Sequence, residues 1–176
     1  MNARSFFCPL LCFALLFVKS VAAGDWPTYQ HDHARSGISS ETLGTPLHEK
    51  WVHAADHGPR PAWPPPARQD YWHELMNLVP RVTYDRAFHP VVAGETLYFG
   101  SSADDRVYAL DTRTGAIRWT FQTEGPVRLA PTIADGKVYF GSDDGSVYAL
   151  AASDGRLVWR RRIAPHDHRI PGNGRM

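Results

Sequence analysis

TLYFGSSADDRVYALDTRTGAIRWTFQ, at residues 96–122, and KVYFGSDDGSVYALAASDGRLVWRRR, at residues 137–162, are two versions of one pattern. Each is preceded by a proline (Pro90, Pro131) and carries a late tryptophan (Trp119, Trp159), so both markers recur at an interval of about 40 residues. One internal hairpin is a residue longer in the first copy, SSADDR against SDDGS. A period near 40 residues with four strand-like runs per unit is the signature of a β-propeller blade.

The runs inside each unit predict strands and not helices. Val138–Phe140 and Val147–Leu150 are short, rich in β-formers and bounded by glycine and aspartate. Asp135-Gly136 predicts a type I′ hairpin, because glycine tolerates the positive φ that this turn requires. The runs are nearly continuously apolar, as expected where both faces of a sheet are covered. We expect strands at 90–93, 96–101, 106–111 and 116–122, and again at 130–134, 137–142, 146–151 and 156–162.

A family resemblance rests on the stretch from Ala109 to Trp119, ALDTRTGAIRW. It resembles the AxDxxTGxxxW docking motif of PQQ-type (quinoprotein alcohol dehydrogenase-like) propeller repeats. The second copy keeps three of the motif positions and has Ala151 where the first has an aspartate, and DWPTY at residues 25–29 resembles the entry segment of the same superfamily. The resemblance implies an all-β, partial β-propeller. It also implies a structural blade-docking role for Ala109, Asp111, Gly115, Trp119, Ala149, Gly155 and Trp159.

The sequence divides into six segments on this interpretation. Residues 1–23 are expected to form a secretory signal peptide, 24–54 an entry segment with an outer strand at 45–54 centred on Trp51, and 55–89 a long insertion rich in proline and aromatic residues. Residues 90–129 and 130–163 are two blades, and 164–176 is a connection to a missing blade. Closed propellers need at least about four blades, so we expect the chain to be the N-terminal fragment of a longer protein.

The leader has the parts of a secretory signal. Arg4 supplies positive charge, the apolar run at 6–18 is too short for a membrane span, and Val21-Ala22-Ala23 suits cleavage. Cleavage removes both cysteines, which excludes disulfides, thiolate metal sites and cysteine nucleophiles from the remaining chain. Net charge is +1 overall, so the chain carries no electrostatic footprint for nucleic acid or anionic membrane. We expect a periplasmic or secreted protein without a membrane span.

Several polar groups resemble parts of metal or phosphate sites, and each is interpreted as an ordinary loop or hairpin feature. Paired histidines offer only two imidazoles at a time, the HE pair does not extend to HExxH because Asn77 stands at the second histidine position, and the paired aspartates lack EF-hand spacing. The groups are His31-Asp32-His33, His166-Asp167-His168, His53 with His57, His73-Glu74, Asp104-Asp105, Asp143-Asp144 and Gly172-Asn173-Gly174.

The resemblance sets the expectation about cofactors. Dehydrogenases of this superfamily use calcium-bound PQQ held by residues from several blades. With two blades and no assignable carboxylate base, this chain is expected to hold no catalytic, cofactor or metal residue, and PQQ with calcium is expected only in a longer parent.

Three functional hypotheses follow. We favour an exported scaffold or binding module that engages further blades or a protein partner. The alternative is the N-terminal part of a secreted PQQ-dependent oxidoreductase, which leaves enzymatic activity uncertain. A truncated product without independent function is the third.

Overall fold

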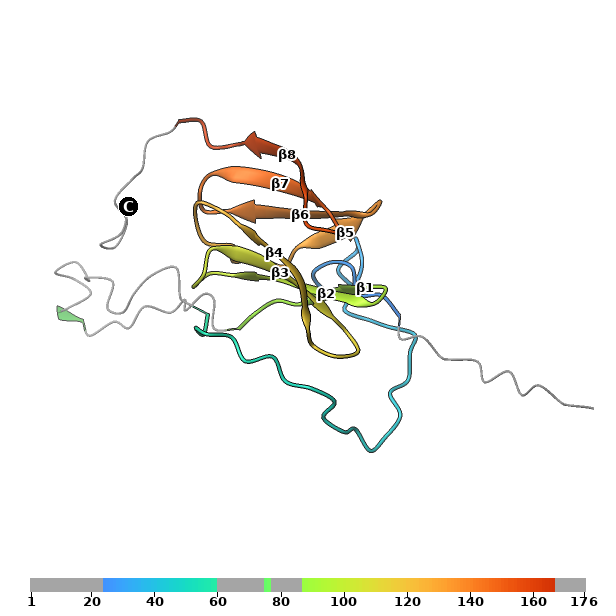
Figure 1. Cartoon of the computed structure of the whole chain (residues 1–176). Helices are drawn as coiled ribbons and strands as arrows, with labels where there is room; N and C mark the ends of the chain where they lie inside the picture. Colours follow the sequence, from blue (N-terminus) through green and yellow to red (C-terminus); the bar gives the residue numbers. More distant parts are fainter. Residues whose placement is uncertain (1–23, 60–74, 77–86, 167–176) are drawn as a thin grey trace, which may run out of the picture.

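Two four-stranded antiparallel sheets make up the ordered architecture of the computed structural model, which describes residues 24–59, 75–76 and 87–166. The sheets lie one above the other in Figure 1, with strand orders β1-β2-β3-β4 and β5-β6-β7-β8. The prediction of an all-β chain with two four-stranded units is confirmed. The strands are β1 (Val91–Ala93), β2 (Thr96–Ser101), β3 (Arg106–Asp111), β4 (Ile117–Gln122), β5 (Thr132–Ala134), β6 (Lys137–Ser142), β7 (Ser146–Ala151) and β8 (Leu157–Arg162).

The two sheets have the same strand register. Tyr98 lies opposite Val91 in the first sheet, and Tyr139 lies opposite Thr132 in the second. Each sheet has one irregularity, after Ala109 in β3 and after Ala149 in β7. The β5–β6 turn has positive φ at both Asp135 (48°) and Gly136 (68°), as a type I′ hairpin requires. The sequence repeat is therefore a structural repeat.

The hydrophobic core lies between the sheets. Val107 and Val138 are fully buried, and the connection from β4 to β5 adds Val127, which is 1% exposed. A side chain on Gly100 would overlap Val127, so glycine is required there for the connection to lie close to β2. Every residue of the last strand, β8, is exposed. The apolar surface is thus covered on the inner side of the pair and open beyond β8.

The entry segment joins the inner strands of the two sheets. Trp26 exchanges backbone hydrogen bonds with Val92 of β1, at 2.8 and 2.9 Å. The next residue, Pro27, accepts a hydrogen bond from the amide of Ile133 in β5. In Figure 1 this segment, in blue, lies beside β1 and β5. The entry segment therefore ties the two innermost strands together.

Residues 45–54, predicted as an outer strand, belong to none of the eight strands. Burial nevertheless alternates from Trp51 to Ala55, as in a strand with one covered face. The predicted leader (1–23), most of the insertion at 55–89 and the end of the chain from residue 167 lie outside the described residues.

Candidate functional site

The joint between the sheets is built around Trp119 of β4. Its indole N–H donates to the carbonyl oxygen of Ala152 at 3.0 Å. Its six-membered ring lies directly over Gly155, where an added Cβ would come within 2.6 Å of the ring. Gly155 has φ +73°, a conformation that favours glycine. Two residues on, Phe121 packs edge-on against Tyr148, with ring centroids 5.8 Å apart.

Trp51 makes the equivalent contacts with the first sheet. Its indole N–H donates to the carbonyl oxygen of Thr112 at 2.8 Å, and its ring lies over Gly115, which also has φ +73°. His53, two residues on, contacts Phe99 and Tyr108 with centroid distances of 5.8 and 6.1 Å. Trp51 and His53 therefore occupy against the first sheet the positions that Trp119 and Phe121 occupy against the second.

Trp159 of β8 is the third tryptophan of the series. It pairs with Ala149 across the sheet, as Trp119 pairs with Ala109, and contacts Tyr139 with a centroid distance of 6.1 Å. Its surroundings differ, because 41% of Trp159 is exposed. A hollow of about 360 Å³ is lined by Trp159, Arg160 and Arg161.

The remaining motif residues shape the turn before the tryptophan. Asp111 accepts hydrogen bonds from the amides of Arg113 and Thr114, and its other oxygen pairs with Arg118 at 2.7 Å. The Arg118 guanidinium, together with these hydrogen bonds, holds the pKa of Asp111 well below its ordinary value. The second copy forms the same backbone turn with Ala151 in place of the aspartate. Ala109 and Ala149 are fully buried, so the motif alanines are packing positions.

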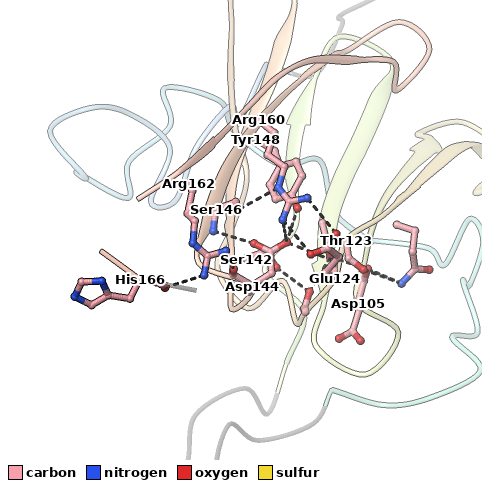
Figure 2. Close-up of polar contacts among 12 residues, drawn as sticks. Asp105, Thr123, Glu124, Ser142, Asp144, Ser146, Tyr148, Arg160, Arg162 and His166 are labelled. Atoms are coloured by element: carbon pink, nitrogen blue, oxygen red, sulfur yellow. Dashed lines mark hydrogen bonds and ion pairs between the residues drawn. The ribbon is translucent and has the colours of Figure 1, made fainter. Parts of the chain in front are cut away.

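A polar cluster closes the far end of the second sheet (Figure 2). Arg160 donates to both carboxylate oxygens of Glu124, at 3.2 and 3.1 Å, and lies 3.6 Å from Asp144. The Tyr148 hydroxyl donates to Asp144, whose side chain is 4% exposed. Burial raises the pKa of Tyr148, and the Asp144 carboxylate raises it further. Because Glu124 lies in the connection between sheets, the cluster fastens this connection to β8.

The two aspartates of each hairpin pair interact with different residues. Asp104 accepts from the Tyr108 hydroxyl at 3.1 Å and lies 3.2 Å from His57, whereas the carbonyl of Asp105 accepts from Thr123. Asp143 pairs with Arg128 at 2.6 Å, and Asp144 belongs to the polar cluster. The members of each pair thus have different partners.

A cavity of about 320 Å³ lies where the entry segment meets β5, lined by Asp25, Pro27, Thr28, His31, Asp32, His33, Thr132 and Ile133. His31 packs against Trp26 with ring centroids 4.9 Å apart. Asp32 binds the hydroxyl and amide of Ser36, and these hydrogen bonds lower its pKa. In the described part of the chain no three histidine, cysteine, aspartate or glutamate side chains gather as a metal site would need.

His53 and His57 contact different side chains. His53 faces the Phe99 and Tyr108 rings, while His57 faces Asp104. The carbonyl of His166 accepts from Arg162, and its predicted companion His168 lies outside the described residues, as do His73-Glu74 and Gly172-Asn173-Gly174.

The sequence analysis did not predict the contact of His53 with Phe99 and Tyr108, nor the ion pair between Arg160 and Glu124. The signal for the first is the spacing itself, since Trp51-Val52-His53 aligns with Trp119-Thr120-Phe121 once the tryptophans are superposed. Residues 124 and 160 are too far apart in the sequence for any local pattern to connect them.

The chain is similar in sequence to known proteins of one repeat family. The model of a family described as outer membrane protein assembly factor BamB matches residues 62–174. A 1-butanol dehydrogenase (cytochrome c) of Thauera butanivorans is 27% identical over 169 residues, covering 90% of this chain and 21% of that protein. Outer membrane protein assembly factor BamB of Yersinia pestis is 34% identical over 92 residues, covering 44% of this chain and 23% of that protein.

The solved structures agree with the fold. The crystal structure of quinohemoprotein alcohol dehydrogenase from Comamonas testosteroni covers 83% of this chain with a TM-score of 0.56 and 25% identity, and the match is 21% of that chain. This chain therefore spans less than a quarter of the length of these relatives. No helix in the described part is long and apolar enough to cross a membrane.

Proposed function

Since the chain belongs to the PQQ-like repeat family represented by outer membrane protein assembly factor BamB, we propose that it is a β-propeller module that works outside the cytoplasm as a scaffold or binding module. The observation that carries this proposal is the repeated joint, in which each sheet offers an outer tryptophan to a neighbour. Trp119 uses that joint inside the chain, and Trp159 presents the same ring at the surface.

The chemistry of the described charged side chains supports a structural role. Arg160, Glu124 and Asp144 hold one another, and Asp111 holds its own turn. These groups are engaged in fixing loops and strands. A binding module of this kind recognises its partner through sheet faces and hairpins.

Location outside the cytoplasm is supported by the secretory pattern of residues 1–23 and by the outer-membrane role in the name of the family. Fusing residues 1–23 to alkaline phosphatase, which is active only after export, tests this point. An inactive, cytoplasmic fusion would contradict it.

The second candidate is the N-terminal part of a PQQ-dependent oxidoreductase. The observation in its favour is the length of the dehydrogenase match, which runs over 90% of this chain and so includes the entry segment as well as the repeats. Among the described residues no three histidine, cysteine, aspartate or glutamate side chains come together. On this hypothesis, residues beyond the described ones complete the site.

Titration of the purified chain from residue 24 onward with PQQ and calcium separates the two candidates. Absorbance, the melting curve and dye-linked alcohol oxidation are followed together, with PQQ alone and calcium alone as controls. The scaffold proposal expects no saturable PQQ binding and no shift in melting temperature, and expects crosslinking in the periplasm to yield a protein partner. Stoichiometric, calcium-dependent PQQ binding with dye reduction would overturn it in favour of the oxidoreductase.

A further inference from the structure

The backbone nitrogen of Gly24 lies beside the carboxylate of Glu41, although the two residues are 17 positions apart. The N–H of Gly24 donates a hydrogen bond to Oε1 of Glu41. A Cβ added to Gly24 would come within 2.6 Å of the same oxygen, so the carboxylate would have to move away from any larger residue at this position. The contact closes a loop over residues 24–41, directly after the predicted leader.

The first sheet fixes the chain immediately after Gly24. The side chain of Asp25 accepts a hydrogen bond from the amide of Gly94 at 2.6 Å. Trp26 exchanges two backbone hydrogen bonds with Val92 of β1. The nitrogen of Gly24 is thus held close to the sheet, and the Asp25 carboxylate adds negative charge next to it.

Glu41 forms no ion pair with a lysine, arginine or histidine side chain in the part of the chain that the structure describes. Its own amide donates to the Ser39 hydroxyl at 3.1 Å, and this hydrogen bond holds the local turn that presents the carboxylate. A carboxylate in this situation suits an ammonium group better than a neutral amide, because a charge-assisted hydrogen bond is stronger than one between a carboxylate and an uncharged donor.

We propose that Glu41 is the binding site for a new N-terminus, the α-ammonium that Gly24 acquires when the leader is removed. This inference rests on the proposed export of the chain. Hydrolysis of the peptide bond between Ala23 and Gly24 by a leader peptidase consumes one water and leaves a carboxylate on Ala23 and an amine on Gly24. The amine binds a proton at neutral pH, because α-amino groups have pKa values of about 7.7–8.0. Removal of the leader thereby converts a neutral hydrogen bond into an ion pair that closes the 24–41 loop.

Titration of the α-amine tests the pair in the chain exported with its own leader. The full chain is expressed in an exporting bacterium, mass spectrometry identifies the N-terminal residue of the product, and the pH dependence of the acylation rate gives the pKa of the α-amine. The wild type is expected to begin at Gly24 and to titrate about half a pH unit higher than Glu41→Gln, as an exposed ion pair should. Glu49→Gln, at an exposed carboxylate of the same segment, is the matched control and should titrate as the wild type.

One further chain separates the pair from a general effect of charge. A chain released from a fusion so that it begins at Ala23 carries its ammonium one residue away, about 3.5 Å along an extended backbone. This chain should titrate at the same pH with and without Glu41→Gln. A wild type that begins at Gly24 but titrates as Glu41→Gln does, or cleavage at a different bond, would overturn the pair and leave export standing. A chain that stays in the cytoplasm with its leader would contradict the export, and the inference with it.

Discussion

Trp119 and Trp159 occupy equivalent positions in successive sheets but have different surroundings. Trp119 lies over Gly155 and donates to Ala152, whereas two fifths of Trp159 faces solvent. The contribution of a docking tryptophan to stability therefore depends on whether the receiving glycine and carbonyl are present. Residue identity alone does not determine it.

Trp119→Ala is expected to lower the free energy of unfolding by roughly 3 kcal/mol, since it removes a large ring and leaves a cavity between the sheets. Trp159→Ala, the matched control, is expected to cost less because 41% of Trp159 is already exposed. Thermal and denaturant unfolding of the two variants measure the difference. Equal effects would mean that Trp119 does not carry the joint.

The Asp111 turn predicts a specific dependence on acid. Because the pKa of Asp111 is lower in the folded chain than in the unfolded one, its stabilisation is complete above the unfolded value near 3.8 and is lost as the pH falls toward the folded value. Asp111→Asn should therefore destabilise the chain at neutral pH, and this difference should shrink progressively below about pH 4. Unfolding at a series of pH values measures it, with Glu49→Gln, at an exposed carboxylate outside the turn, as the control. A difference that grows on acidification would contradict the assignment.

At the scale of the element, the two sheets differ in the side chains of the turn between the third and fourth strands. The first copy has Asp111 to accept the following amides, and the second forms the same turn with Ala151, while Asp154 accepts only from the amide of Arg156. The backbone shape is thus set by the repeat, and the aspartate adds side-chain hydrogen bonds to it.

Ala151→Asp/Asp154→Thr, which gives the second turn the residue pair that Asp111 and Thr114 form in the first, is accordingly expected to stabilise the second sheet by roughly 1 kcal/mol, the net value of a typical hydrogen bond. The reverse change, Asp111→Ala, should destabilise the first sheet by a similar or larger amount because it also removes the Arg118 partner. Denaturant midpoints at neutral pH give both values. A destabilising Ala151→Asp/Asp154→Thr would show that the second turn does not accept the aspartate geometry.

Most strand positions follow from the sequence, and their deviations have a simple cause. Residues 96–101, 106–111, 137–142 and 146–151 are strands as predicted. The predicted strands at 90–93 and 130–134 begin later, after Pro90 and Pro131, because proline has no amide hydrogen to donate to a ladder. The Trp119 joint follows from the motif. His57 against Asp104 and Arg160 against Glu124 could not be predicted, because each pairs residues that the fold alone brings together.

At the scale of the whole molecule, three of the described tryptophans form the docking series, and two of them lie over a glycine of the next sheet. Trp51 lies over Gly115, Trp119 lies over Gly155, and Trp159 is 41% exposed on β8. In repeat proteins the stability is close to a sum of unit and interface contributions. Adding or removing one sheet should therefore change the free energy of unfolding by the contribution of that sheet and of one interface.

Replacing the residues after Arg162 with a second copy of residues 123–163 should raise the melting temperature. The added sheet supplies a new glycine and carbonyl to Trp159, and a new Phe140–Tyr148 pair to Arg161, so apolar area now exposed is buried. The same extension with Gly155→Val in the added copy only is the control, because a side chain there would overlap the indole. An extended chain that melts no higher than this control would refute the additive picture.

Trp51 and Trp119 each contact a glycine of the following sheet, and this arrangement has a consequence for how such a gene can change in length. Trp119 ends one unit and Gly155 lies in the next, yet every unit encodes both a tryptophan and a glycine. Tandem duplication of one unit therefore creates a matching contact at the new boundary without any accompanying point mutation, and deletion of one unit removes a contact without leaving a mismatch. Unequal recombination between copies thus yields compatible proteins directly, which makes the number of blades an easily inherited variable.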